Sequence, residues 1–363
     1  MKFVHDSPRF EQLLAAVAEA RDIDESLIEK DYWITHALWT LEHAGLDVWF
    51  KGGTSLSKGF GLIKRFSEDL DLKIGPGTSG IVDVTNWKSG GNAGSEVRKR
   101  FFDALSKLPL EGMTIELDES SMGKDARGAN LRVRYPGVHL TKLPGAVSPF
   151  ILLEVGDARV HPSSSRQITS FVHDHLEAEG VIGNHAANRP TKVNCVHPLV
   201  TLIEKLDAII HRFPKNDVLA SAFVRHYEDA AHIIQGMDSL PPMGDFDGVG
   251  SLIATMLREK QIRKIPDPTD ACFNPAKGER WGQVLRAHES IDPLFWGPRL
   301  SLDDSSDAIR TFLGGLNLGL QVDPQEPDGH VDDEHFGVGF SEDFLKSVAQ
   351  PTTAPSDKKR KGR

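Results

Sequence analysis

The sequence has few cysteines and no long apolar run. Its 363 residues include only Cys195 and Cys272, too few for a disulfide framework or a four-cysteine zinc site. No apolar stretch approaches the ~20 residues that a membrane-spanning helix needs, and the opening residues MKFVHDSPRF lack the apolar region of a signal peptide. We therefore expect a reduced, cytoplasmic protein that makes no contact with a membrane.

Basic charge is also in short supply. The chain carries 42 lysines and arginines against 52 aspartates and glutamates, a formal net charge of −10. This balance argues against a protein that coats nucleic acid, but it leaves room for a local basic cleft. At ~150 residues per domain, the length favours two domains with an appendage.

The first part of the chain predicts a mixed α/β domain. Apolar residues recur at helical spacing in two opening stretches, the second of them over residues 25–43. Strict alternation of polar and apolar residues in DLDLKI predicts a strand at 69–74. The other expected elements are a strand at 47–51, a helix at 95–107, and strands near 113–117, 131–134 and 150–155. Strands separated by helices favour one mixed sheet with flanking helices, which we place in a domain at residues 1–165.

The later part of the chain reads as helical. Its apolar residues recur at helical spacing, so we expect a second, mainly α-helical domain over residues 166–320. The expected helices lie at 199–213, 219–234, 252–259 and 281–288. Residues 321–363 predict an acidic loop, a short helix and a basic, disordered tail. The fold class expected for the whole chain is α+β.

Two carboxylates mark the most informative stretch of the sequence. Asp69 and Asp71 are two apart in a strand, so both side chains project from the same face, and Ser67 joins them if the strand extends that far back. Two carboxylates this close repel each other, and a shared divalent cation relieves the repulsion. Because D-L-D-L is also a common strand sequence, the pair alone does not establish a metal site.

A glycine turn precedes these carboxylates. Gly52, Gly53 and Thr54 lie between an expected strand and an expected short helix. Glycines there let backbone amides approach an anion, and a helix N-terminus favours negative charge. The order of strand, Gly-Gly-Thr, helix and Asp-x-Asp is more specific than either motif alone. A phosphate cradle beside an acidic metal site is what phosphoryl or nucleotidyl transfer requires.

These motifs resemble a known family. The segment at residues 50–72, with its run FSEDLDL, is similar to the Gly-Gly-Ser/Thr turn and Asp-x-Asp of DNA-polymerase-β-type nucleotidyltransferases. More narrowly it resembles the AbiEii/AbiGii group of toxins, which includes the MenT-like toxins of type IV toxin–antitoxin systems. The helical EKDYW at 29–33 is similar to that family's opening helix, and the resemblance covers residues ~10–235. It implies a polymerase-β-like sheet whose active site is completed by the helical part.

The resemblance also implies roles for single residues. Lys205, in LIEKLDA, resembles a helical lysine that contacts nucleotide phosphate, and Asp229, in RHYED, resembles the aspartate of an Arg-x-x-x-Asp helix that completes the site. Without the resemblance, a solvated helix face is the ordinary explanation for both. The Gly52–Thr54 amides and the Ser67 hydroxyl are expected to hold phosphates. Ser67 is alternatively a phosphorylation site used in neutralisation.

Cofactors and partners follow from the same resemblance. It implies an NTP substrate and a two-metal Mg²⁺ site held by Asp69 and Asp71, with NMP transferred to an RNA acceptor, the 3′ end of tRNA, so that translation stops. It also implies a separately encoded antitoxin. The basic residues Lys58, Lys64 and Arg65, just beyond the turn, are expected to help hold RNA or nucleotide.

A third carboxylate is expected on a neighbouring strand. Glu154, the lone acid in FILLEV, is costly inside an apolar strand unless it is paired or metal-bound. It is a candidate third metal ligand, but it alternatively pairs with Arg159 or faces solvent.

The sequence leaves two other functions open. One is a nucleotidyltransferase that modifies a small molecule or protein, and the other is a non-catalytic interaction module that retains the fold.

Two further motifs are weaker. The GPGTSG run at 75–80 matches a dinucleotide-binding pattern, but no helix opens directly from it. His330 and His335 flank three acids in an expected surface loop, which favours a solvated segment over a zinc site.

Overall fold

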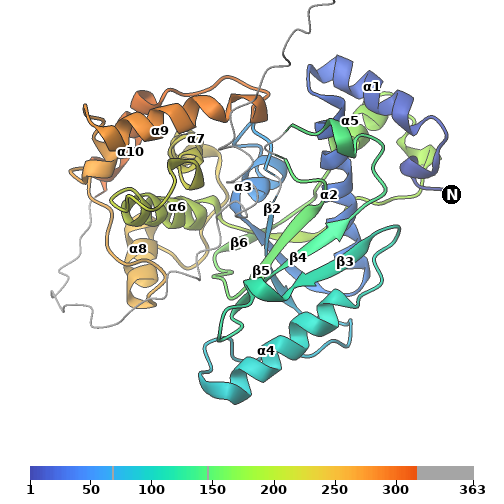
Figure 1. Ribbon diagram of the computed structural model, residues 1–363, viewed down its shortest axis with the longest axis horizontal. Coiled ribbons are helices and arrows are strands. Elements are labelled where there is room, and N and C mark those ends of the chain that lie inside the picture. Colours follow the sequence, from blue (N-terminus) through green and yellow to red (C-terminus); the bar gives the residue numbers. More distant parts are fainter. Residues whose placement is uncertain (68, 145–146, 317–363) are drawn as a thin grey trace, which may run out of the picture.

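A seven-stranded mixed sheet forms the centre of the protein (Figure 1), within the residues 1–67, 69–144 and 147–316 that this computed structural model describes. The strands are β1 Asp47–Lys51, β2 Asp69–Gly75, β3 Thr114–Asp118, β4 Gly128–Arg134, β5 Ile151–Gly156, β6 Ser163–Arg166 and β7 Val193–Val196. Their order is β3-β4-β5-β2-β1-β7-β6. Strand β2 lies near the middle, antiparallel to β1 and parallel to β5, so the expected mixed sheet is confirmed.

Helices flank the sheet and continue beyond it. They are α1 Phe10–Arg21, α2 Glu25–His43, α3 Gly52–Thr54, α4 Gly91–Ser106, α5 Phe171–Ala178, α6 Pro198–Arg212, α7 Arg225–Gln235, α8 Gly248–Arg258, α9 Glu279–Ser290 and α10 Leu302–Gly315. Helix α2 has the bounds expected from its apolar periodicity, and it begins at Asp24, whose carboxylate accepts a hydrogen bond from the Ser26 amide. The helical character expected after residue 198 is confirmed as well.

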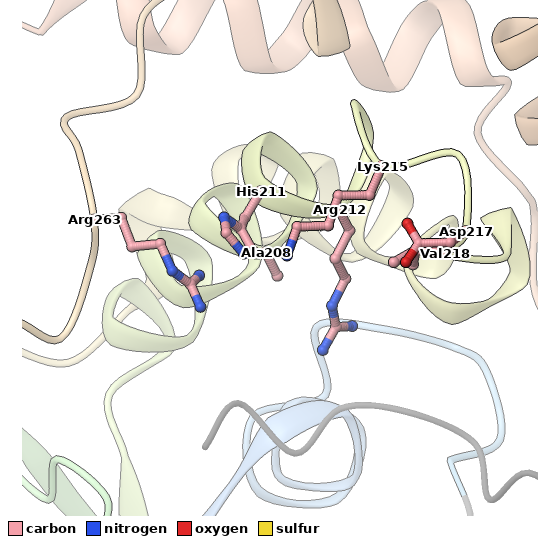
Figure 2. A pocket seen from close by; sticks show the side chains of 7 residues that line it. All are labelled: Ala208, His211, Arg212, Lys215, Asp217, Val218 and Arg263. Atoms are coloured by element: carbon pink, nitrogen blue, oxygen red, sulfur yellow. Dashed lines mark hydrogen bonds between the residues drawn. The ribbon is translucent and has the colours of Figure 1, made fainter. Parts of the chain in front are cut away.

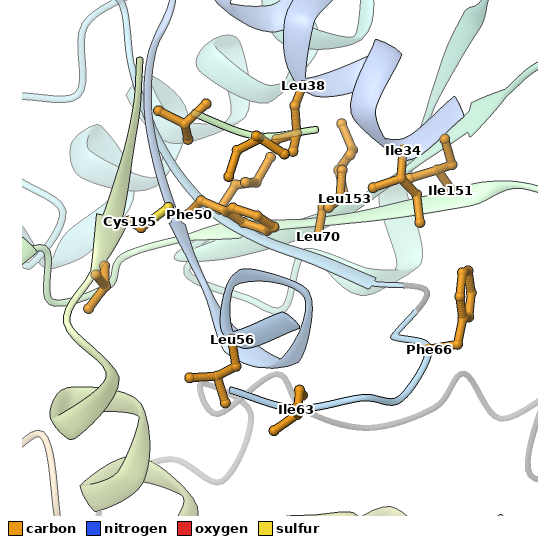
Figure 3. Packing of buried hydrophobic residues seen from close by; sticks show 14 of the residues in the cluster. Ile34, Leu38, Phe50, Leu56, Ile63, Phe66, Leu70, Ile151, Leu153 and Cys195 are labelled. Carbon is orange, nitrogen blue, oxygen red and sulfur yellow. The ribbon is translucent and has the colours of Figure 1, made fainter. Parts of the chain in front are cut away.

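One face of the sheet is apolar and is covered by α2. Figure 3 shows Ile34 and Leu38 of α2 above Phe50, Leu70 and Leu153, which come from three adjacent strands. All five side chains are buried, with at most 1% of the surface of any of them exposed. Burying five such side chains contributes on the order of 10 kcal/mol before the entropy of ordering the chain is subtracted. This packing fixes which face of each central strand points away from α2.

Alternation along β2 assigns the opposite face. Because successive side chains point to opposite sides of a strand, Leu70 and Leu72 on the α2 side place Asp69 and Asp71 on the other side. A shift of one residue in the register would bury both aspartates against α2 and expose the leucines. The apolar core therefore holds the two carboxylates in place.

The sheet extends past the boundary that we expected near residue 165. Strand β6 spans that position, and β7 pairs in parallel with β1, so the sheet continues to Val196. The sequences of these strands, SSSR and VNCV, are short and lack a clear alternation, which is why they were not expected. The helix α5 between them was also missed.

The C-terminal helical part is tied back to the approach to β2. We call residues 292–300 the strap. The Phe66 amide donates a 2.6 Å hydrogen bond to the Leu294 carbonyl, and the Trp296 amide donates one of 3.0 Å to the carbonyl of Lys64. Arg65 and Phe295 form an isolated antiparallel bridge between these bonds. The strap therefore runs beside the segment that leads into Asp69.

A single arginine fastens the strap to α7. The Arg299 guanidinium donates to Glu228, with its Nη2 2.9 Å and its Nε 3.0 Å from Oε2, while the Leu300 amide donates to Oε1 at 2.8 Å. Glu228 is fully buried. Such a charge-assisted, two-pronged contact is strong and geometrically specific.

No helix among the described residues is both long enough and apolar enough to cross a bilayer. The acidic loop, short helix and basic tail expected at 321–363 lie outside the described residues.

Candidate functional site

The two aspartates of β2 are buried side by side on the face away from α2. Asp69 is 7% exposed and Asp71 is 6% exposed. The Asp69 carbonyl accepts a 2.7 Å hydrogen bond from the Thr54 hydroxyl, which also lies 3.0 Å from the carbonyl of Ser67. The Thr54 side chain thus joins the glycine turn to the start of β2.

The glycines of the turn are required by how closely it approaches β2. Gly52 has a φ of +72°, and a Cβ there would lie 1.7 Å from Asp71 Oδ2. At Gly53 a Cβ would lie 2.8 Å from Ser67 Oγ and 2.6 Å from an Arg65 nitrogen. The turn therefore packs directly against the residues that the sequence singled out. Ser67 is itself buried, with its hydroxyl beside Gly53.

Glu154 joins the two aspartates. It is the β-sheet neighbour of Asp71 on β5, so the two side chains lie on the same face of the sheet. Burial, Asp71 and Asp69 raise the pKa of Glu154 well above its ordinary value, although Arg225 opposes them. Arg159, the alternative partner, instead pairs with Glu259 at 2.6 Å.

Two cations border these carboxylates. Arg225, at the start of α7, lies 3.8 Å from Asp69, and Lys51, opposite Asp71 on β1, lies 3.6 Å from Glu204 of α6. Burial favours the neutral form of Lys51, but Glu204, Asp71 and Glu154 outweigh it and raise the pKa of the lysine. Lys51 therefore remains charged beside a group of acids.

Lys205 and Asp229 meet in a buried cluster next to this group. Asp229 accepts two hydrogen bonds of 2.7 Å from Arg65, and Lys205 Nζ lies 2.9 Å from its Oδ2. Burial alone would raise the pKa of Asp229, but Arg65 and Lys205 outweigh burial and lower the pKa well below its usual value. Burial also lowers the pKa of Lys205, an effect that Asp229 only partly offsets. We call Arg65, Lys205 and Asp229 the buried triad.

The basic residues after the turn occupy different places from those expected. The Lys58 side chain is 8% exposed and lies 2.5 Å from Asp31 Oδ1 and 2.9 Å from the Thr169 carbonyl, while Arg65 belongs to the buried triad. The expectation that these two hold RNA or nucleotide is therefore not supported, since their charges are used inside the fold. Lys64 is exposed.

Sequence reasoning missed three charged residues of the site. Lys51 immediately precedes the Gly-Gly-Thr turn, and Arg225 lies four residues before Asp229, on the same face of a helix. These positions relative to the motifs could have identified both residues from the sequence. Glu204 carried none beyond its place next to Lys205.

The carboxylates fit a divalent cation that a substrate helps to bind. Asp71 and Asp69 raise the pKa of Glu154, which shows that negative charge is concentrated here, and a bound cation would relieve this arrangement. Within the described ranges, no three His, Cys, Asp or Glu side chains are already grouped to hold a metal ion. Mg²⁺ needs no such group, since it takes one or two carboxylates and completes its shell with water and substrate phosphates.

A glycine turn packed on paired strand carboxylates, with buried lysine and arginine beside it, defines a nucleotidyltransferase-type site on a mixed sheet. Residues 37–310 match the family model described as the nucleotidyl transferase AbiEii toxin of type IV toxin–antitoxin systems. The chain belongs to this family of nucleotidyltransferases.

A solved structure is similar in fold. MenT4, the nucleotidyltransferase toxin Rv2826c from Mycobacterium tuberculosis H37Rv, is 17% identical over 93% of this chain and 98% of its own, with a TM-score of 0.51. JHP933 from Helicobacter pylori is 15% identical over 80% of this chain and 95% of its own, with a TM-score of 0.34. No curated protein sequence gave a significant match.

Because the turn approaches β2 so closely, we predict that alanine at Gly52 reduces activity much more than alanine at Gly61. Gly52→Ala places a methyl group on Asp71, so we expect nucleotidyl transfer to fall by about 100-fold, the scale of an ångström-level displacement in an active site. Gly61→Ala is the matched control, because Gly61 also has a positive φ, +65°, but its Cβ would meet nothing within 4 Å. Both variants carry a backbone cost of about 1–2 kcal/mol. Equal losses of activity in the two variants would contradict the close-approach explanation.

The buried triad predicts a pH-dependent stability. Asp229→Asn leaves Arg65 and Lys205 without their carboxylate, and we expect the free energy of unfolding to fall by about 3–5 kcal/mol at pH 7. Since the pKa of Asp229 is lowered in the folded protein, its contribution is complete above the unfolded pKa of ~3.9 and is lost as the pH falls further.

Denaturant unfolding at a series of pH values measures this contribution. The gap between wild type and Asp229→Asn is expected to stay constant down to about pH 4 and to narrow below it. The exposed Asp103→Asn serves as a control that removes a surface carboxylate. A gap that widens on acidification would contradict the assignment.

Proposed function

We propose that the protein is a Mg²⁺-dependent toxin that transfers NMP from an NTP to a terminal hydroxyl of RNA, the 3′ end of tRNA. The observation that carries this proposal is the burial of Asp69 and Asp71 directly against the Gly52–Gly53 turn, with Glu154 beside them. Family membership supports a type IV toxin with nucleotidyltransferase activity. The metal ion and the RNA acceptor are our extension of it.

Each residue of the site has a role in this proposal. Asp69 and Asp71, with Glu154 as a third carboxylate, would hold Mg²⁺, which supplies positive charge for the transferred phosphoryl group and its attacking and leaving oxygens. The amides of the Gly52–Thr54 turn and the Ser67 hydroxyl bind the NTP phosphates. Lys205 adds a cation to the triphosphate side of the site.

Asp229 acts through its neighbours. Its two hydrogen bonds orient Arg65, and its contact with Lys205 fixes that ammonium group beside the turn. We therefore assign Asp229 as a positioning residue.

The proposed partners are an NTP, an acceptor RNA and a separately encoded antitoxin. The family model names a type IV toxin–antitoxin system, so a neutralising partner belongs to the proposal.

The proposal is tested by label transfer from each α-³²P-NTP to total bacterial tRNA in the presence of Mg²⁺. We expect wild type to label tRNA and Asp69→Ala to abolish the label, because the variant removes a carboxylate from the metal site. Melting temperature is measured in parallel, and Asp69→Asn serves as a second variant of nearly equal volume.

Either rival function would give a different result. Binding of NTP without label on RNA would favour a small-molecule or protein acceptor. Absence of binding of both NTP and Mg²⁺ would favour an interaction module. An active, folded Asp69→Ala protein would contradict the metal assignment.

We predict that replacing Arg225 strengthens the binding of a metal ion and weakens the binding of NTP. Its guanidinium lies 3.8 Å from Asp69 and stabilises the carboxylates in the absence of a metal ion. Arg225→Gln removes this competing charge, so we expect Mn²⁺ to bind roughly tenfold more tightly, a change of ~1.4 kcal/mol. NTP is expected to bind more weakly, because a cation facing its phosphates is lost.

Calorimetric titration of the NTP-free protein with Mn²⁺ measures the first effect, and titration with NTP measures the second. Arg225→Lys keeps the charge and should retain wild-type metal affinity. Weaker Mn²⁺ binding by Arg225→Gln would instead indicate that Arg225 only supports the fold.

A further inference from the structure

A basic cavity lies at the C-terminal end of α6, outside the site described above. Figure 2 shows the side chains that line this cavity of about 200 Å³. They are Ala208, His211, Arg212, Lys215, Asp217, Val218 and Arg263. Three of the seven are lysine or arginine, in a chain whose net charge is −10.

The cationic side chains are held in place. Arg212 donates a 3.0 Å hydrogen bond to the Ala222 carbonyl, and Arg263 donates one of 2.9 Å to Asp207 Oδ2. Lys215 Nζ lies 2.7 Å from His211 Nε2, and the ammonium group can only donate in this contact. These three cations are half-buried. Because their side chains are already ordered, an anion that enters the cavity loses little free energy in fixing them.

The cavity continues the helix face that carries Lys205. Ala208 and Arg212 follow Lys205 at i+3 and i+7, so the three side chains share one face of α6. At 1.5 Å per residue, Arg212 lies about 10 Å along the helix axis from Lys205. In Figure 2 the Arg212 side chain extends from α6 toward the blue part of the ribbon, the colour of the residues around the glycine turn.

A buried histidine lies within reach of both positive charges. His226 is fully buried, and neither of its ring nitrogens has a hydrogen-bond partner. Burial lowers its pKa well below the usual value, and the charges of Lys205 and Arg212 lower it further. The cavity and Lys205, which belongs to the proposed NTP site, lie along one face of α6.

We propose that this cavity binds a backbone phosphate of the acceptor RNA strand. The inference rests on the proposed function, and it adds a site for the acceptor to the site for the nucleotide. Guanidinium and ammonium groups in a fixed concave arrangement suit a phosphodiester, which arginine can grip with two parallel hydrogen bonds. A distance of about two helical turns from Lys205 places the cavity beyond the NTP phosphates, on the path of a second substrate.

Replacing Asp217 tests the proposal, because its effect on phosphate binding should be opposite to that of replacing Lys215. This exposed carboxylate is the one acid among the residues that line the cavity. Removing it should strengthen the binding of a phosphate, whereas removing the Lys215 charge should weaken it. A residue that only supports the fold would not give effects of opposite sign.

The experiment measures RNA binding by fluorescence anisotropy in the full-length Asp69→Ala background, with a short, 5′-labelled single-stranded RNA over a series of salt concentrations. With Lys215→Gln we expect several-fold weaker binding, and a slope of log K against log salt that falls by ~0.7 for one lost phosphate contact. With Asp217→Asn we expect tighter binding. Matched controls come from the exposed pair at the C-terminal end of α4, Lys107→Gln and Asp103→Asn, which make the same charge changes away from the cavity.

Steady-state transfer by the otherwise wild-type enzyme separates the two proposals. Lys215→Gln is expected to raise KM for RNA and to leave KM for NTP and the melting temperature unchanged. If wild type transfers label to RNA but Lys215→Gln and Asp217→Asn behave like their α4 controls, the cavity assignment is wrong and the proposed function stands. If KM for NTP rises instead, the cavity belongs to the nucleotide, which also overturns it. If wild type neither binds nor labels RNA, the proposed function fails and the acceptor site fails with it.

Discussion

The arrangement of the site depends on one buried carboxylate. Asp229 is bound by Arg65 from the segment before β2 and by Lys205 from α6, while its own helix is α7. Three parts of the chain that are far apart in sequence therefore meet at a single charge. Because an unpaired ion is so costly in a protein interior, we expect the ion pairs among Arg65, Lys205 and Asp229 to form or break together. The helices cannot shift relative to the glycine turn without separating oppositely charged groups.

Electrostatic balance explains the rest of the site. Asp69, Asp71 and Glu154 place negative charge on one face of the sheet, and Arg225 and Lys51 approach it from the helical side and from β1. The protein's own cations therefore balance part of this negative charge. In the proposed reaction, a metal ion bound together with its nucleotide would take over that role.

Whether a feature of the fold or the site could be predicted depends on how far apart in the sequence the contacting residues lie. Alternation within β2 placed Asp69 and Asp71 on one face, and the lone acid in β5 identified Glu154, because strand geometry is local. The pairing of Arg65 with Asp229 spans 164 residues and leaves no local pattern. Strand β7 was missed for a related reason. Its parallel pairing with β1 comes from tertiary contact, and VNCV on its own is too short to indicate a strand.

The strap has a consequence for the synthesis of the protein. Residues 292–300 form hydrogen bonds with the segment before β2 and with Glu228, which is next to Asp229. The motif near residue 70 is therefore contacted by residues that are synthesised more than two hundred positions later. A nascent chain on the ribosome exposes Gly52 and Asp69 early but lacks the groups that set them in place. The contacts between the strap and the segment that leads into Asp69 can therefore form only after almost the whole described fold has left the ribosome.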